Sequence, residues 1–107
     1  MLFIELPIFT RCAVDLFSDE DLTELQKTLL ENPTAGNVIP GSKGLRKLRA
    51  PLSGRGKRGG ARVIYYYWSS QERCYLVYAY AKNVAADLTQ EQLQRLAAVI
   101  ESEVSHE

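Results

Sequence analysis

Two runs of β-branched and aromatic residues, separated by a short polar segment, constrain the fold of this 107-residue chain most strongly. The runs are Ala61–Trp68 (ARVIYYYW) and Cys74–Ala81 (CYLVYAYA), and residues 69–73 (SSQER) lie between them. Such runs are typical of β-strands, and this connection is short enough for a β-hairpin. Counting outward from the turn puts Arg62 approximately opposite Ala81. The start of the first strand and the end of the second are therefore expected side by side.

Two helices are expected before this hairpin. Residues 8–17 and 19–31 carry apolar side chains at helical intervals. Ser18 lies between them and is a typical N-cap, and the three acids that follow it suit the positive end of a helix dipole. Asn32-Pro33 is expected to end the second helix, because a residue before proline disfavours the helical conformation. The two segments are predicted to form an antiparallel helical hairpin.

The other predicted strands are shorter and less regular. Residues 1–6 alternate loosely and run into Pro7, which is typical of a strand near a sheet edge. Residues 44–50 predict a heavily charged strand. A turn-rich connector is expected before it, over residues 32–43, and a glycine-rich basic loop after it, over residues 51–60.

A final helix is predicted near the C-terminus. Thr89 and Gln92 fit a capping box, and apolar residues follow at helical intervals. The predicted order of elements is β-α-α-β-β-β-α within one domain over residues 1–107. We therefore expect an α+β fold: a twisted, mainly antiparallel sheet with an N-terminal helical hairpin and a C-terminal helix, the helices covering one face.

The equal numbers of basic and acidic residues, 13 of each, hide a strong segregation of charge along the chain. Residues 32–71 contain no acid and eight bases: Lys43, Arg46, Lys47, Arg49, Arg55, Lys57, Arg58 and Arg62. An uncompensated positive segment repels itself and weakens folding unless a polyanion neutralises it. We expect this segment to bind nucleic acid or another acidic partner, rather than to be an ordinary solvated face.

The residue inventory disfavours most kinds of catalytic centre. The one histidine, His106, is next to the last residue, where chains fray. Cys12 and Cys74 lack the spacing of a metal or redox motif and are expected to be packing residues. No acidic cluster adjoins the basic segment, and the glycine-rich stretch lacks the GxxxxGK[ST] pattern of a P-loop. No metal and no cofactor is expected.

The sequence also bears on location. Its longest strongly apolar uncharged run is Cys74–Ala81, far shorter than the roughly 18 residues of a membrane span. No basic residue precedes Glu5, as one would in a secretory leader. The expected location is the cytoplasm, and no membrane partner is expected.

Lysine, arginine and tyrosine are the reactive side chains that remain, and they suit cleavage of RNA by its own 2′-hydroxyl group. Arginine binds phosphate oxygens in a bidentate manner. A lysine crowded by other cations is a candidate general base, because its charged form is disfavoured. Cations around the developing phosphorane charge can supply much of a rate enhancement.

Strand geometry is expected to bring several of these side chains together. Side chains alternate along a strand, so Lys47 and Arg49 share one face. Arg62 begins one hairpin strand and Lys82 ends the other, so both are expected at one end of the sheet. Most of the six tyrosines are expected in the core, whereas Tyr80 is a candidate for stacking on an RNA base.

The block Gly44–Arg49 (GLRKLR), followed by residues 54–66 (GRGKRGGARVIYY), resembles the HigB branch of the RelE/ParE toxin superfamily. The order of elements agrees over nearly the whole chain. The resemblance implies a RelE-like fold and a toxin of a type II toxin–antitoxin system that cleaves mRNA in the A site of the 70S ribosome. It also implies inhibition by a cognate antitoxin, commonly one with a helix-turn-helix region, so that DNA is reached only through the antitoxin.

The resemblance also implies roles for single residues. The family's basic positions on the second strand fall on Lys47 and Arg49, its arginine opening the third strand on Arg62, and its basic position closing the last strand on Lys82; Asn83 stands where relatives often have arginine. The implied catalytic groups are Arg62, which would stabilise the phosphorane, and Lys47 or Lys82 as acid or base. The implied RNA-binding residues are Arg46, Arg49, Arg55, Lys57, Arg58 and Tyr80.

Two other functions fit the same residues. A toxin of the ParE type would share the fold but bind DNA gyrase and leave mRNA intact. A plain RNA-binding module, for instance a ribosome-associated one, would bind RNA without cutting it.

Overall fold

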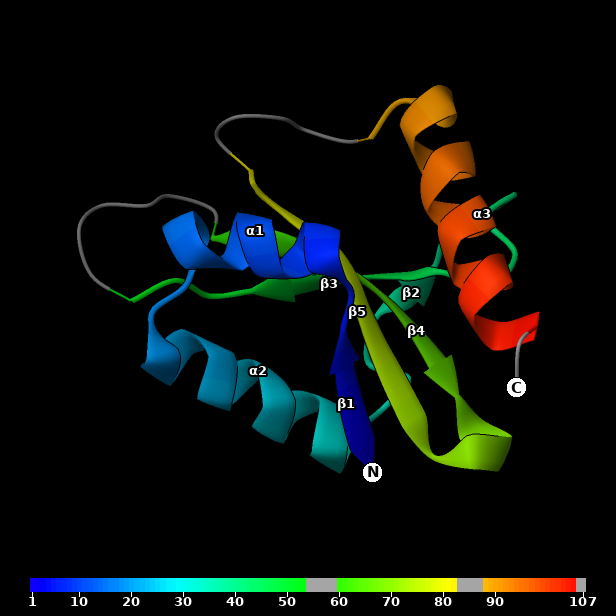
Figure 1. Cartoon of the computed structure of the whole chain (residues 1–107). Helices are drawn as coiled ribbons and strands as arrows, with labels where there is room; N and C mark the ends of the chain where they lie inside the picture. The colour runs from blue at the N-terminus through cyan, green and yellow to red at the C-terminus, as the bar shows by residue number, and fades with distance from the viewer. Residues whose placement is uncertain (54–59, 83–87, 106–107) are drawn as a thin grey trace.

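The chain forms a five-stranded sheet and three helices in a computed structural model that describes residues 1–53, 60–82 and 88–105 (Figure 1). The N-terminal part holds β1 (Leu2–Glu5), α1 (Pro7–Leu16) and α2 (Asp19–Glu31). The remaining elements in chain order are β2 (Asn37–Val38), β3 (Arg46–Ala50), β4 (Ala61–Trp68), a 3₁₀ turn (Ser69–Gln71), β5 (Arg73–Ala81) and α3 (Gln90–Ser105). Apart from β2, the elements follow the predicted order within a few residues.

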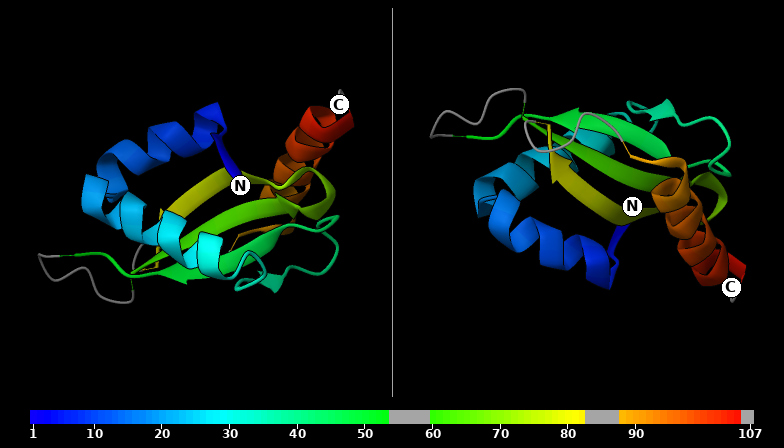
Figure 2. Two further views of the ribbon diagram at one scale, coloured as in Figure 1. Left: turned by 90° about the horizontal axis from the view of Figure 1, so that it is seen from below. Right: turned by 90° about the horizontal axis from the view of Figure 1, so that it is seen from above.

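The sheet is mainly antiparallel, as predicted. Its strand order is β1-β5-β4-β3-β2, and β1 at one edge runs parallel to β5 while all other neighbours are antiparallel. The predicted hairpin is β4 and β5, in which Arg62 pairs with Tyr80 rather than with Ala81. The register shifts by one residue between Ile64 and Tyr65, which leaves Val77 of β5 without a partner as a β-bulge. The strong twist of the sheet is visible in both views of Figure 2.

The prediction that the helices cover one face of the sheet was wrong. Helices α1 and α2 lie as a pair on one face, and α3 packs on the other (Figures 1 and 2). The reason lies in β4, where Val63 and Tyr65 join the core under α1 and α2, and Ile64 joins the core under α3. A strand that is apolar on both faces must be covered on both, and a continuous apolar run is the mark of such a strand.

The connector over residues 32–43 contains β2, which the sequence did not predict. Only two residues of β2 pair, Asn37 with Lys47 and Val38 with Arg46. The buried Ser42 hydroxyl holds the turn that follows, donating to the main-chain carbonyl of Ile39. A two-residue strand has no periodicity to detect, so only its partner strand reveals it.

The predicted helix starts are confirmed. Ser18 and Asp21 form a reciprocal capping box at the start of α2, since each side chain accepts a hydrogen bond from the other's main-chain N–H, both at 3.1 Å. Thr89 and Gln92 do the same at the start of α3. Asn32 is the C-cap of α2, one residue before Pro33. None of the described helices is long and apolar enough to cross a membrane.

Candidate nucleic-acid interface

Three basic residues share the α3 face of the sheet. Arg49 in β3 pairs with Arg62 in β4, and Arg62 pairs on its other side with Tyr80 in β5. Lys47 stands in the next row, where it pairs with Ile64. Ile64 and Tyr80 both belong to the core under α3, so the alternation of side chains puts the three bases on this face.

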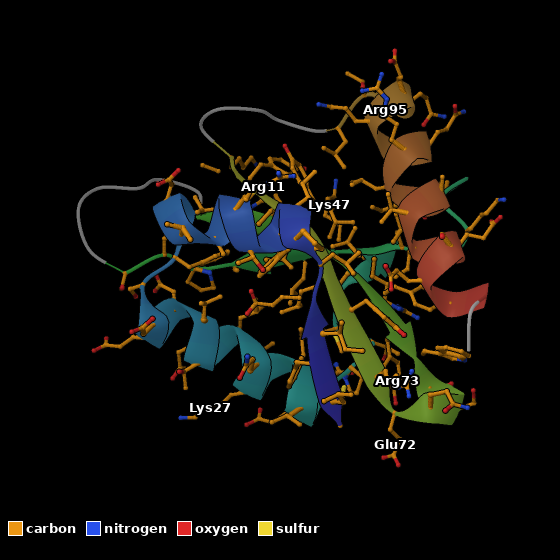
Figure 3. All side chains as sticks on the ribbon, viewed as in Figure 1. Arg11, Lys27, Lys47, Glu72, Arg73 and Arg95 are labelled. Carbon is orange, nitrogen blue, oxygen red and sulfur yellow. The ribbon has the colours of Figure 1, made fainter. Side chains whose placement is uncertain are left out.

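These basic side chains are accessible to a ligand. Arg49 is exposed, and Lys47 and Arg62 are half-buried. Neighbouring strands lie about 4.8 Å apart, so side chains in one row are close enough to contact adjacent phosphates of one strand. In Figure 3, Lys47 lies well away from Glu72 and Arg73, which mark the β4–β5 turn at the other end of the hairpin.

Lys82 lies at the same end of the sheet as Arg62, as predicted. It follows β5 directly, and its main-chain N–H donates to the carbonyl of Gly60 at 3.1 Å. Gly60 immediately precedes β4, so the start of β4 and the end of β5 are joined there. The Lys82 side chain is exposed. Basic residues of β3 and β4 therefore lie on the same part of the molecule as Lys82, which follows β5.

Arg46 is not part of this group. It pairs with Tyr65, a residue of the core under α1 and α2, so its side chain belongs to the opposite face. Its guanidinium donates to the carbonyls of Gly36 at 2.8 Å and Thr34 at 3.5 Å. These hydrogen bonds hold the segment between α2 and β2 against β3. A guanidinium engaged in this way is less available to bind RNA.

Lys43 is also occupied elsewhere. It lies in the turn between β2 and β3, and its ammonium pairs with the Glu101 carboxylate of α3 at 2.5 Å. This contact links the turn to the helix on the α3 face. Three of the eight bases of the acid-free segment, Arg55, Lys57 and Arg58, lie outside the described residues, as do Asn83 and His106.

Tyr80 contributes mainly to the core. Its side chain is only 7% exposed, and its ring lies 6.1 Å from that of Tyr78, centre to centre. A ring buried to this extent offers little surface on which an RNA base could stack. Tyr78 is half-buried on the same face, in the row of Lys47 and Ile64, and presents more of its ring.

The sequence did not reveal that Tyr78 and α3 contribute to this face. Tyr78, Gln92 and Arg95 line a shallow hollow of about 190 Å³ together with Ile8 and Leu96. Burial, with a smaller contribution from Cys12, raises the pKa of Tyr78, so its phenol stays protonated and can donate a hydrogen bond. The bulge at Val77 puts Tyr75, Tyr78 and Tyr80 on one face, and nothing in the sequence marks that bulge.

The face has the composition expected for binding a polyanion. None of the described strand residues whose side chains belong to this face is acidic. In residues 1–53, 60–82 and 88–105, no group of three or more His, Cys, Asp or Glu side chains could hold a metal ion. Cys74 is fully buried on the other face, and this burial raises the pKa of its thiol to about 12, so the sulfur stays protonated.

Comparison with known proteins agrees with this architecture. The fold is similar to that of an Escherichia coli RelE toxin, a double arginine-to-alanine mutant in the free state, with a TM-score of 0.59. The two chains are 13% identical, and the match covers 91% of this chain and 93% of that one, so the likeness is one of fold. The family model described as "RelE toxin of RelE / RelB toxin-antitoxin system" matches residues 8–105. Because that match spans nearly the whole chain, the protein belongs to the RelE toxin family.

Proposed function

We propose that this protein is a cytoplasmic endoribonuclease that cuts mRNA in the A site of the translating ribosome. In this proposal it is the toxin of a type II toxin–antitoxin pair and is inhibited by a cognate antitoxin of the helix-turn-helix class, which the HigB resemblance implies. The observation that carries the proposal is the gathering of Lys47, Arg49 and Arg62 on one face, with Lys82 at the end of the neighbouring strand. Membership of the RelE toxin family supports it.

The chemistry would use the RNA's own hydroxyl as nucleophile. The 2′-oxygen attacks the adjacent phosphorus, the bond to the 5′-oxygen of the next nucleotide breaks, and the products are a 2′,3′-cyclic phosphate and a 5′-hydroxyl. Arg62 binds the phosphoryl oxygens and stabilises the charge that develops on them. Lys47 or Lys82 takes the proton from the 2′-hydroxyl, and a second donor protonates the leaving 5′-oxygen.

The remaining candidates would bind the RNA strand on either side of the cut. Arg49 lies directly opposite Arg62 and is exposed, which suits a contact to a neighbouring phosphate. Arg55, Lys57 and Arg58 stay predicted RNA contacts. Tyr80 and Arg46 are disfavoured, because the Tyr80 ring is buried and the Arg46 guanidinium binds main-chain carbonyls on the other face. Acidic side chains on α2 would disfavour docking of RNA on the opposite side.

The proposal is tested by mapping RNA ends. We expect brief expression of the wild-type chain to create new 5′-hydroxyl ends within translated mRNA. The Arg62→Ala variant should cut at least about 100-fold more slowly with purified ribosomes, because it lacks a contact that strengthens in the transition state. The matched control is Arg11→Ala, which removes an exposed arginine of α1 on the opposite face (Figure 3). Equal rates for wild type and Arg62→Ala would contradict the assignment.

The same experiment separates the two alternatives. A gyrase inhibitor of the ParE type would leave mRNA intact and damage DNA instead. A plain RNA-binding module would produce no new 5′ ends, and its overexpression would not arrest growth.

A further inference from the structure

A further hollow on the α3 face lies between the last turns of α3 and the turn that joins β2 to β3, which passes beside the helix in Figure 1. Its volume is about 190 Å³, and its lining residues are Lys43, Tyr66, Ile100, Glu101 and Val104. The hollow is smaller than the roughly 300 Å³ at which sites for drug-sized ligands begin. Apolar and aromatic side chains beside two charged ones suit a small, flat ring with polar edges.

The hollow adjoins the basic residues of this face. Tyr66 follows Ile64 by two residues in β4, so the two side chains share the α3 face, and Ile64 pairs with Lys47. Two residues of a strand span about 7 Å. A single strand of RNA bound to Lys47 would therefore bring a base close enough to enter the hollow.

Tyr66 presents an ordered ring to this hollow. The half-buried ring packs against the main chain of Gly44, since a Cβ added at that glycine would lie 3.1 Å from a ring carbon. The ring centre of Tyr75, its partner on β5, lies 6.4 Å away. An aromatic ring held in this way is a platform on which any nucleic-acid base can stack.

Lys43 and Glu101 supply hydrogen-bonding groups of opposite kind. The Lys43 ammonium is a donor and the Glu101 carboxylate is an acceptor, and the two pair at 2.5 Å. Both side chains are exposed, and an exposed pair contributes little stability, so a ligand can separate it at low cost. Lys43 has a φ of 61°, which is uncommon for a residue other than glycine. A lysine in so strained a position points to a role for its ammonium.

We propose that this hollow binds one base of the RNA and favours a base that carries an exocyclic amino group. The base stacks on Tyr66, its amino group donates to Glu101, and a ring nitrogen or keto oxygen accepts from Lys43. Uracil has no amino group, and its ring N–H lies between two keto oxygens that repel the carboxylate. The inference rests on the proposed function in placing RNA on the α3 face.

The test compares cytosine with uracil, which differ mainly in that amino group. Short 2′-deoxy oligonucleotides of cytidine and of uridine carry equal charge and cannot be cut by 2′-hydroxyl attack. We expect the wild-type chain to bind the cytidine oligonucleotide at least about fivefold more tightly, measured by fluorescence anisotropy. Equal binding of the two, a preference for uridine, or failure to bind either would overturn the proposal.

Two acids of α3 provide matched variants. Glu101 lines the hollow and Glu103 does not, although both are exposed. Glu101→Gln should bring the ratio of the two affinities close to one, because a glutamine amide can serve a keto oxygen as well as an amino group. Glu103→Gln should leave the ratio unchanged. A ratio that keeps its wild-type value in Glu101→Gln would refute the site.

Neighbouring tyrosines of β4 test the stacking. Tyr66→Leu should weaken binding of both oligonucleotides at least about fivefold, because it removes the aromatic ring. Tyr67→Leu is the control, since Tyr67 is also half-buried but lies on the opposite face. If Tyr66→Leu fails to fold, the exposed Glu101→Gln still tests the site. Binding by folded Tyr66→Leu as tight as that of the wild type would overturn the proposal.

Cleavage of translated mRNA separates this inference from the proposed function. A wild-type chain that prefers cytidine through Glu101 but cuts no mRNA would refute the nuclease function and leave the base site standing. A chain that cuts mRNA but binds both oligonucleotides equally would overturn the base site alone.

Discussion

Arg49 and Arg62 face each other directly across β3 and β4, although like charges in that position destabilise a sheet. A fold that needed only stability would have no use for this pair. The pair lies on the same face as Lys47, and a bound polyanion would offset the repulsion among these cations.

Removing one of the two charges should therefore stabilise the free protein. We expect Arg49→Gln to raise the free energy of unfolding by about 0.2–1 kcal/mol, because it relieves the cross-strand repulsion, and to weaken RNA binding. Denaturation in urea, compared with the wild type, checks the stability. The exposed Arg11→Gln of α1 is the control and should change stability much less. A destabilised Arg49→Gln would show that the guanidinium stabilises the fold.

Tyr65 illustrates a polar contact that lies inside the core. Its ring is fully buried, and its hydroxyl accepts from the N–H of Gly36 and donates to the carbonyl of Pro33, both at 2.9 Å. Gly36 has no room for a side chain, since an added Cβ would lie 2.8 Å from a carbon of the Tyr65 ring. These contacts hold the segment between α2 and β2 against the sheet.

Loss of the hydroxyl should be costly. Tyr65→Phe leaves the buried N–H of Gly36 without a partner, so we expect a loss of about 1–3 kcal/mol in the free energy of unfolding. The half-buried Tyr67 lies two residues further on the same face. Tyr67→Phe is therefore the matched control, and its loss should be smaller. Chemical denaturation of both variants measures the difference, and equal losses would contradict this role of Tyr65.

At the scale of elements, the start of α2 is joined to the segment that follows β3. The Asp21 carboxylate caps its own helix through Ser18 and also accepts from the main-chain N–H of Ser53 at 3.0 Å. Burial acts to raise the pKa of Asp21, but the hydrogen bonds from Ser18 and Ser53 outweigh it, and the net pKa is lowered. One carboxylate thus stabilises both the start of α2 and the segment that follows β3.

The lowered pKa fixes the direction of a pH effect. A carboxyl group whose folded-state pKa lies below its unfolded value adds stability above the unfolded value, and this stability is lost as the pH falls through the folded pKa. We therefore expect Asp21→Asn to destabilise the protein near neutral pH, with a penalty that shrinks in acid. Urea denaturation over a pH series tests this. The neighbouring Asp19→Asn is the control, and a penalty for Asp21→Asn that does not change with pH would contradict the assignment.

At the scale of the whole molecule, charge is divided between the two sides of the sheet. The first turn of α2 carries Asp19, Glu20 and Asp21, on the side opposite the face of Lys47, Arg49 and Arg62. Acidic and basic residues are therefore equal in number but separated in space. One side of the molecule would attract nucleic acid, and the other would repel it.

This division predicts how binding depends on salt. If Lys47, Arg49, Arg62 and Lys82 each contact a phosphate, binding of a single-stranded oligonucleotide should show a log–log slope of about −3 against salt concentration. Fluorescence anisotropy with a 2′-deoxy oligonucleotide, which cannot be cut by this mechanism, measures the slope. Arg62→Ala should reduce its magnitude by about 0.7, whereas Arg11→Ala should not change it. A slope near zero would mean that these cations serve a protein partner.

Apart from β2, the local chemistry of the chain was enough to predict its helices and strands. The helix caps at Ser18 and Thr89, the end of α2 before Pro33, and the β4–β5 hairpin all depend on residues close to one another in sequence. The same holds for the shared face of Lys47 and Arg49, because alternation along a strand is a property of the strand alone. The acid-free basic segment is likewise a property of the amino-acid sequence itself.

Other features were decided only by the packing of distant segments. The bulge at Val77 fixes which tyrosines join the α3 face, and the contact of Arg46 with the carbonyls of Thr34 and Gly36 withdraws that arginine from the cationic group. The placement of α3 on the second face and the pairing of β2 have the same origin. Neighbouring residues determine helix ends and strand alternation. Register, coverage of a face and the meeting of side chains instead depend on which surfaces fit together once the chain has folded.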